Sequence, residues 1–206
     1  MKQAGIGIVI PVYNREQELR RTFDSVVAQT YRPIHVVLVD NGSTDGSLDL
    51  CRELKGAYET DDFRITVVEE AKRGPSAARN RGLACVTEAV SLYMQAFESN
   101  SSADIAGCTI RLVPEQGKPY SAKAVFSNRV EPHLFHSTLG TVRYAVRTAV
   151  VRAVGGWPED YMRWEDWGLG IKLLLFTDRI VWVQTPPLVN VYLHADSITG
   201  YRYVPN

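Results

Sequence analysis

The chain has 206 residues, and its 23 lysine and arginine residues balance 23 aspartate and glutamate residues, so the formal net charge at pH 7 is zero. This balance argues against a general nucleic-acid-binding protein, which would carry a basic excess. The length is enough for one large domain with a substantial hydrophobic core.

The N-terminal segment predicts a βαβ unit. Apolar runs at residues 8–12 and 34–39 predict two buried strands, which are parallel when a helix joins them. The helix between them is predicted by helically spaced apolar residues, namely Leu19, Phe23, Val26 and Val27. Ligands bind at the carboxyl ends of strands in an open parallel sheet. The polar turns 13–15 and 40–43, which follow the two strands, therefore predict a binding site.

The alternation of helices and strands continues as far as residue 86. Next come a helix, a strand and a helix, at residues 44–58, 65–68 and 76–86. A new strand thus starts about every 27–30 residues, the spacing of βα repeats. A fourth strand is due near residue 88, but the apolar spacing of residues 87–100 is helical.

The C-terminal part predicts shorter elements without repeats or linkers. Residues 114–128 are polar and turn-rich. Strands are predicted at residues 105–113, 143–147, 180–183 and 188–192, and helices at 148–154 and after residue 167. We expect one α/β domain over residues 1–206, with a mostly parallel sheet flanked by helices.

Cysteine spacing and hydropathy place the chain in a broad class. Cys51, Cys85 and Cys108 form neither a disulfide framework nor a zinc motif, so we expect reduced core residues. No apolar run approaches the ~20 residues of a membrane span. We expect a cytoplasmic protein without a transmembrane segment, and contact with the inner membrane face stays open.

Two residues in the first turns are candidates for nucleotide binding. Tyr13 can cover a flat base, although the turn can also be an ordinary connection. The segment lacks the glycine-rich fingerprint of dinucleotide-binding proteins. Asp40 can accept a hydrogen bond from a ribose hydroxyl or a base N–H, or it can be a turn former for residues 41–43. We expect Asp40 at the sheet edge, within reach of a nucleoside and not buried in the core.

Three further segments carry candidate chemistry. The small residues at 74–78 open a helix whose N–H groups favour an anion near Arg79, which can also be a solvated surface residue. Glu165 and Asp166 lie between Trp164 and Trp167. Their charges can simply favour the helix dipole, but indoles also stack on sugars and a carboxylate can take a proton from a sugar hydroxyl. His194 is a weaker candidate, because a lone histidine is more often an ordinary surface or core residue than a ligand.

Taken together, four segments resemble the family 2 glycosyltransferases of the GT-A fold. They read IVIPVYNRE, VVLVDNGSTDGS, GPSAARNRGL and WEDWGLGIKLLL, in this order. The resemblance implies inverting transfer of a hexosyl group from a nucleotide-diphosphate sugar, usually a UDP-sugar. It also implies a saccharide, lipid-linked or other hydroxyl acceptor, in polysaccharide or glycoconjugate synthesis. Residues 1–113 would bind the donor, and residues 114–206 would bind the acceptor and carry catalysis.

The resemblance also implies roles for individual residues. Asp166 matches the catalytic base and Glu165 its neighbour, with Trp164 and Trp167 at the acceptor. His194 matches, more loosely, a histidine that meets the metal or the diphosphate. The nucleotide-binding positions are Pro11, Val12, Tyr13, Asn14, Asp40, Asn41, Gly74, Arg79 and Asn80.

One part of the family pattern is missing. The family holds Mg²⁺ or Mn²⁺ through an Asp-x-Asp pair at the end of the fourth strand. Neither that strand nor the pair is present near residues 87–91. We therefore expect that a mobile segment of about 15–25 residues, judged from the βα repeat, is absent here. Two residues written as neighbours between Val86 and Leu92 would then not be joined by a peptide bond.

Two other functions stay open as alternatives to a metal-dependent transferase. A catalytically silent nucleotide-sugar-binding protein would lack the metal ligands altogether. A nucleotidyltransferase would need a glycine-rich loop with arginine and lysine after the first strand, and PVYNREQEL is not such a loop.

Overall fold

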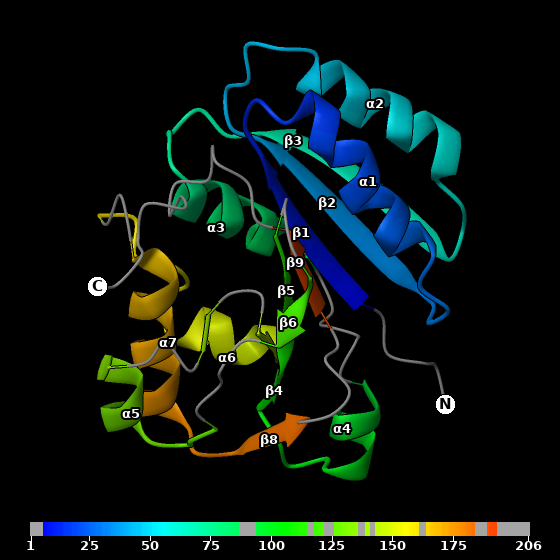
Figure 1. Cartoon of the computed structure of the whole chain (residues 1–206). Coiled ribbons are helices and arrows are strands. Elements are labelled where there is room, and N and C mark those ends of the chain that lie inside the picture. Colours follow the sequence, from blue (N-terminus) through cyan, green and yellow to red (C-terminus); the bar gives the residue numbers. More distant parts are fainter. Residues whose placement is uncertain are drawn as a thin grey trace. The chain divides into compact units, whose positions relative to one another are not determined.

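The computed structural model describes residues 6–86, 94–114, 118–121, 126–135, 139–140, 143–160, 164–183 and 189–192 (Figure 1). The chain divides into two compact units. Unit 1 comprises residues 1–91 and 146–169, and unit 2 comprises residues 92–145 and 170–206. The predicted division into a donor-binding and an acceptor-binding half is a functional one, and it stays a prediction.

Unit 1 is built on a parallel three-stranded sheet. Its strands are β1 (Ile6–Val12), β2 (Ile34–Asp40) and β3 (Phe63–Glu69), in the order β1–β2–β3. The register places the last residues of the three strands opposite one another. The predicted parallel βαβ unit is confirmed, and the turns that follow the strands lie at one edge of the sheet.

Helices cover both faces of this sheet (Figure 1). The alternation of side chains along β2 shows the two layers, because Val36 and Leu38 belong to one apolar cluster, while Val37 and Val39 belong to another. The first cluster includes residues of α1 (Glu16–Val27) and α2 (Ser47–Tyr58). The second includes Ala78 of α3 (Pro75–Cys85).

The close approach of α3 to β1 depends on Gly82. A methyl group at this position would overlap the side chain of Val9. We expect Gly82→Ala to lower the free energy of unfolding by about 1–3 kcal/mol, the usual cost of overpacking. Gly56→Ala is the matched control, because Gly56 also lies in a helix but nothing stands within 4 Å of the added methyl group. That variant should gain about 0.5–1 kcal/mol. Urea denaturation of both variants checks the pair, and equal effects would contradict the packing.

Unit 2 holds two small sheets. One contains β4 (Ile105–Cys108) between β7 (Tyr144–Val146) and β8 (Ile180–Val183). The other contains β5 (Ile110–Val113) between β6 (Tyr120–Ser121) and β9 (Val189–Tyr192). The helices there are α4 (Met94–Ser99) and α5 (Val130–Phe135). Helix α6 (Thr148–Ala153) belongs to unit 1, and α7 (Glu165–Phe176) crosses the boundary between the units.

The prediction of a single strand over residues 105–113 is wrong. The chain changes sheets at Thr109, whose N–H donates to Val183 O, while the N–H of Cys108 donates to Arg143 O. All four residues of β4 are buried, whereas in β5 only Ile110 is buried, Arg111 is exposed and the last two residues are half-buried. An apolar run in the sequence does not show that its two parts have different neighbours.

Other predictions have mixed outcomes. None of the three cysteines forms a disulfide, and Cys51 and Cys108 are buried while Cys85 is half-buried. Burial raises the pKa of the Cys51 thiol to about 12, so it stays protonated at neutral pH.

Among the described residues, no helix has both the length and the apolarity to cross a membrane. Residues 87–93 lie outside the described residues, so the expected break in the chain stays a prediction.

Candidate functional site

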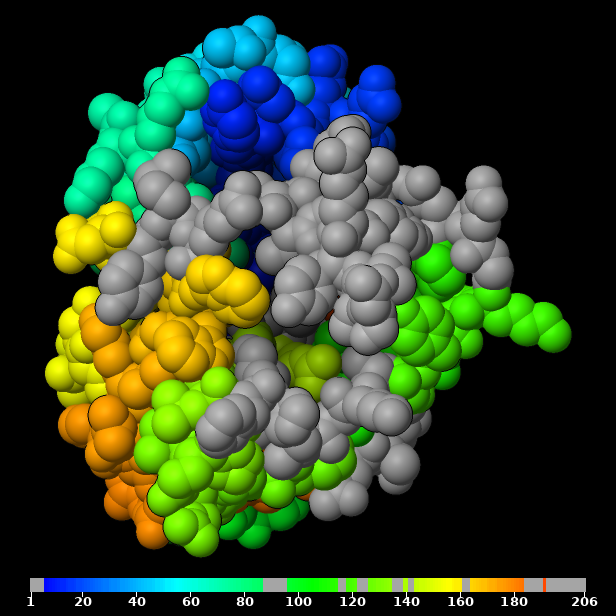
Figure 2. All heavy atoms as spheres, turned by 60° about the vertical axis from the view of Figure 1, so that its left-hand side comes forward, coloured from blue at the N-terminus to red at the C-terminus, as the bar shows by residue number. Residues whose placement is uncertain are grey.

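The turns after β1 and β2 are joined side by side. Asn14 Oδ1 accepts a hydrogen bond from the N–H of Thr44 (2.8 Å), and the N–H of Asn14 donates to Ser43 Oγ (3.1 Å). Asn14 has φ 49°, a left-handed conformation that asparagine tolerates better than most residues. The blue and light-blue atoms at the top of Figure 2 show the two segments in contact. The sheet therefore ends in one continuous polar surface.

Asp40 ends the central strand β2 and is 2% exposed. Our expectation that it is not buried is wrong, because β1 and β3 flank β2 on both sides. Asp40 Oδ2 accepts from the N–H groups of Gly42 and Ser43, both at 3.1 Å, which confirms the turn-forming alternative. Its other oxygen, Oδ1, is buried and has no hydrogen-bond partner among the described residues.

Asn41 holds the loop after β3. Its Nδ2 donates to the carbonyl oxygens of Glu70 (2.9 Å) and Lys72 (2.8 Å), and its Oδ1 accepts from the N–H of Gly74 (2.8 Å). Gly74 has φ 126°, a conformation that side chains rarely adopt. The amide of Asn41 is thus committed to the loop, and a direct contact with a nucleotide stays a prediction.

Tyr13 stands at the surface of this edge. Tyr13 is 46% exposed, and Arg73 Nη1 donates a hydrogen bond to its hydroxyl at 3.2 Å. The Arg73 guanidinium also lies 5.7 Å from the ring centroid. Val12, by contrast, is 1% exposed and packs in the core, so only its backbone can face a ligand. No pattern in the sequence indicated Arg73 as part of this edge.

Arg79 on α3 reaches the acidic pair at the start of α7. Its Nη1 lies 3.0 Å from Glu165 Oε1 and 3.5 Å from Asp166 Oδ1. The side chain of Asp166 is 36% exposed, against 14% for that of Glu165. The alternative of a solvated arginine does not hold, because 17% of the Arg79 side chain is exposed. Glu165 thus anchors the arginine, and Asp166 is the more accessible carboxylate.

Trp164 precedes this pair in an unusual conformation. Its φ is 66°, and 70% of the residue is exposed. A bulky residue in the left-handed region costs of order 1–3 kcal/mol, and such residues gather at functional sites. Trp167 is half-buried. The predicted acceptor-binding role of both tryptophans stays a prediction.

Asn80 contacts a turn 77 residues away in the sequence. Its amide bonds both backbone groups of Trp157 and also Glu159 Oε1. Lys72 Nζ reaches the other carboxylate oxygen of Glu159 at 2.6 Å. The hydrogen bond from Asn80, followed by that from Lys72, holds the pKa of Glu159 below its usual range. No pattern in the sequence indicated that Asn80 and Lys72 contact Trp157 and Glu159.

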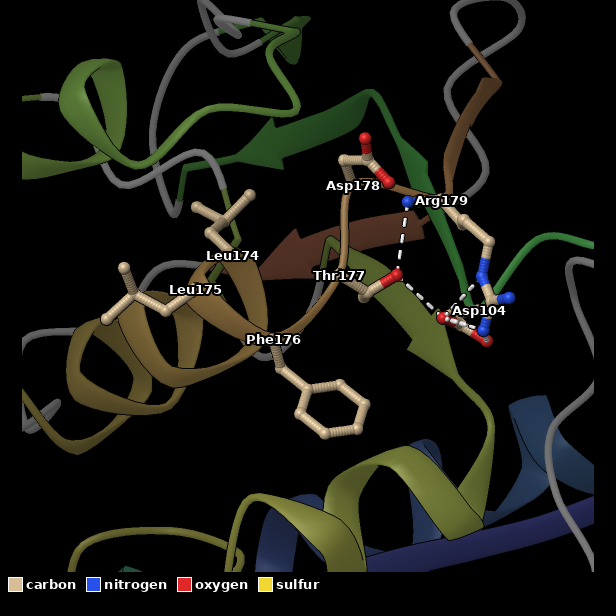
Figure 3. A pocket seen from close by; sticks show the side chains of 7 residues that line it. All are labelled: Asp104, Leu174, Leu175, Phe176, Thr177, Asp178 and Arg179. Atoms are coloured by element: carbon tan, nitrogen blue, oxygen red, sulfur yellow. Dashed lines mark hydrogen bonds and ion pairs between the residues drawn. The ribbon is translucent and has the colours of Figure 1, made fainter.

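A pocket of about 550 Å³ lies elsewhere, at the C-terminal end of α7 in unit 2. Figure 3 shows Arg179 and Thr177 directed at Asp104. Arg179 donates to both oxygens of the buried Asp104, and Thr177 Oγ1 donates to Oδ2 at 2.6 Å. Because both carboxylate oxygens are partnered, this group stabilises unit 2 and offers no open acceptor to a ligand.

The described residues do not form a metal site. Among them, no group of three or more histidine, cysteine, aspartate or glutamate side chains could hold an ion. The carboxylates of Glu165 and Asp166 already face the cationic Arg79. His194, the predicted metal contact, lies outside the described residues.

The sequence matches a known family in its N-terminal part. Residues 7–96 match the model of glycosyl transferase family 2. The predicted resemblance to family 2 glycosyltransferases is therefore confirmed for this part of the chain. The matched residues include the three strands and the helix α3 that carry the edge described above.

Longer matches extend over both units. Glycosyltransferase AglE of Haloferax volcanii is 28% identical over 172 residues, covering 74% of this chain and 56% of AglE. The S. aureus TarS 1–349 complex with UDP-GlcNAc has a TM-score of 0.76 at 20% identity, over 98% of this chain and 62% of the TarS 1–349 chain. The mannosyltransferase PcManGT of Pyrobaculum calidifontis, in complex with GDP-Man and Mn²⁺, has a TM-score of 0.65 at 19% identity, over 97% of this chain and 59% of PcManGT.

These similarities establish the fold. The chain has the α/β architecture of GT-A glycosyltransferases, as its sequence predicts. It spans less than two thirds of the length of each of the three proteins.

Proposed function

We propose that the chain is a glycosyltransferase that moves a sugar from a UDP-sugar to an acceptor hydroxyl with inversion. The observation that carries the proposal is Asp40 Oδ1, a buried acceptor without a partner among the described residues, at the carboxyl end of the central strand. Buried polar atoms in folded proteins are nearly always hydrogen-bonded. A ligand N–H or O–H would complete this one.

A uracil nucleotide supplies the missing donor. The N3–H of uracil lies on the edge of a flat ring, so it can donate to Asp40 while the ring lies against Tyr13. The exposed Tyr13 directly follows β1, and its partner Arg73 lies in the loop after β3, so a flat group and a cationic group are available at that edge. The nucleotide bound by TarS, UDP-GlcNAc, has the same base.

The acidic pair supplies the reaction chemistry. Asp166 would take the proton of the acceptor hydroxyl while the oxygen of that hydroxyl bonds to the anomeric carbon of the donor sugar. The bond from that carbon to the diphosphate breaks at the same time, and UDP leaves with the electron pair. A single displacement of this kind inverts the configuration at the anomeric carbon. Glu165 and Arg79 would hold Asp166 in place, and Trp164 would stack on the acceptor.

A divalent metal would stabilise the charge that develops on the leaving diphosphate. The structure of PcManGT contains Mn²⁺, and this similarity supports the proposal that this chain also uses a metal ion. No group that could hold a metal ion occurs among the described residues, and a nucleotide-sugar-binding protein without turnover stays the alternative. The acceptor, and a role in polysaccharide or glycoconjugate synthesis, stay part of the proposal.

A panel of UDP-glucose, UDP-GlcNAc, UDP-galactose and GDP-mannose separates these functions. Each is added with and without Mn²⁺, and the melting temperature is followed. A ligand at 100 times its Kd stabilises the folded state by about 2.7 kcal/mol. We expect a shift with one UDP-sugar and release of UDP from it in Mn²⁺. A shift without release would favour the silent binding protein, and no shift with any donor would contradict both functions.

A further inference from the structure

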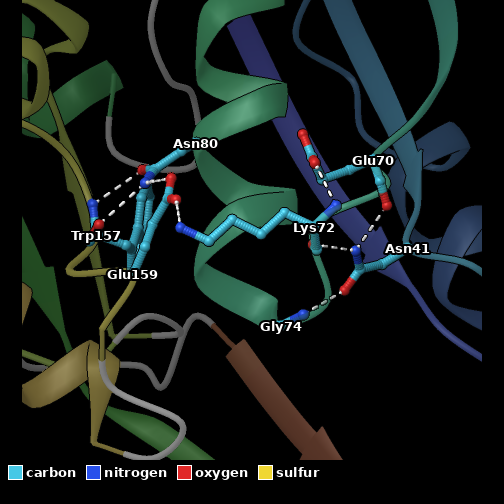
Figure 4. Close-up of polar contacts among 7 residues, drawn as sticks. All are labelled: Asn41, Glu70, Lys72, Gly74, Asn80, Trp157 and Glu159. Carbon is cyan, nitrogen blue, oxygen red and sulfur yellow. Dashed lines mark hydrogen bonds and ion pairs between the residues drawn. The ribbon is translucent and has the colours of Figure 1, made fainter.

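Asn80 uses its whole amide to hold the turn between α6 and α7. Its Oδ1 accepts from the N–H of Trp157 (2.9 Å), and its Nδ2 donates to the carbonyl oxygen of Trp157 (2.9 Å) and to Glu159 Oε1 (2.8 Å). Figure 4 shows the amide of Asn80 facing the Trp157 backbone and the carboxylate of Glu159. The side chain has no further donor to offer a nucleotide.

The same turn is tied to the loop that follows β3. Lys72 Nζ lies 2.6 Å from Glu159 Oε2, so Glu159 accepts from two elements at once. The loop that carries Lys72 is itself held by Asn41, at the end of β2 (Figure 4). A continuous set of hydrogen bonds therefore runs from the strand ends to residues 157–159.

The held turn contacts Arg79 through Trp157. The Arg79 guanidinium lies 5.9 Å from the centroid of the Trp157 ring, a distance at which a cation and an aromatic ring attract each other. The oppositely charged partners of Arg79 are Glu165 and Asp166. Arg79 thus contacts both the ring of Trp157, whose backbone Asn80 holds, and the acidic pair.

We propose that Asn80 is a positioning residue for Asp166, acting through Trp157 and Arg79, and not a nucleotide-binding residue as its sequence position suggests. The proposal rests on the function proposed above. Its physical basis is that small displacements of a catalytic group carry a large kinetic cost, since a misplacement of about 1 Å can lower a rate by about 10²-fold.

The first test removes the two hydrogen bonds that the Asn80 amide nitrogen donates. Asn80→Asp keeps an acceptor for the Trp157 N–H but removes both donors and places a negative charge beside Glu159. We expect UDP release to fall by about 10–100-fold, while the Kd for UDP, measured by calorimetry, stays within about threefold, less than one lost hydrogen bond. Asn80→Asp combined with Glu159→Gln restores a donor facing the new carboxylate, and UDP release should recover. A parallel loss of UDP affinity, or no recovery in the double variant, would overturn the proposal.

The second test uses two neighbouring glycines. Gly156 (φ 65°) and Gly155 (φ 75°) both adopt left-handed conformations. A methyl group at Gly156 would overlap Asn80 Oδ1, whereas nothing lies within 4 Å of one at Gly155. Both Gly→Ala variants should lose stability through backbone strain, but only Gly156→Ala should also lose UDP release per folded molecule. Equal rates in the two folded variants would contradict a positioning role.

Hydrogen exchange separates this proposal from the function on which it rests. The N–H of Trp157 should lose protection in Asn80→Ala, which removes its acceptor, while the N–H groups of α3 keep theirs. That result, with a wild-type protein that neither binds UDP nor releases it, would overturn the enzymatic function and with it the positioning role, while leaving the Asn80–Trp157 contact established. Unchanged protection of Trp157 would overturn the contact itself.

Discussion

Asp166→Asn should lower turnover by about 10²-fold or more, because the amide keeps the shape of the side chain but cannot accept the proton of the acceptor hydroxyl. Donor affinity should stay unchanged. Stability should change little, since the side chain is 36% exposed and Arg79 keeps its 3.0 Å contact with Glu165. The measurement is the rate of UDP release at saturating donor, together with a calorimetric Kd for UDP.

Two controls sharpen this result. Asp49→Asn changes an exposed aspartate on α2, far in sequence from the acidic pair, and should leave the rate unchanged. Glu165→Gln should lower the rate less than Asp166→Asn does, because it weakens the anchor of Arg79 but leaves the base in place. Near-normal turnover in Asp166→Asn would transfer the role of base to another residue.

The second large effect concerns Asp40. Asp40→Ala should weaken UDP binding by about 1–3 kcal/mol, the cost of a hydrogen bond lost from a buried polar site. The alanine variant also releases the N–H groups of Gly42 and Ser43, so it should lose stability as well. The two losses need to be separated.

Asp40→Asn separates them. The amide oxygen can still accept from Gly42 and Ser43, while the amide nitrogen would present donors to the base in place of an acceptor. We expect near-normal unfolding in urea and a loss of UDP affinity similar to that of the alanine variant. Normal UDP affinity in both variants would remove Asp40 from the nucleotide site.

The sequence predicted the first three strands and helices well, because their periodicity is strong. Val36 to Val39 form a continuous apolar run, and β2 is indeed covered on both faces. The run at residues 105–113 misled because its mostly apolar pattern predicts one strand, although Thr109 divides it between two sheets. Apolar runs predict burial, but they do not predict which strands are neighbours.

The contacts within the site were harder to predict. Arg79 and Glu165 are 86 residues apart, and Asn80 and Trp157 are 77 apart, so no local pattern joins them. The burial of Asp40 also escaped prediction, because it depends on both neighbouring strands. In the described part of the chain β1 has one strand neighbour, β2, and the predicted fourth strand falls on residues outside that part.

The most direct test of the account is a titration of UDP followed by the chemical shifts of backbone amides. The account predicts that the changes gather at the ends of β1 and β2, at Tyr13 and at residues 40–43. The pocket at the end of α7, with Asp104 and Arg179, should stay unchanged. Changes centred on Asp104 and Arg179, or no changes at saturating UDP, would contradict a nucleotide site at the carboxyl edge of the sheet.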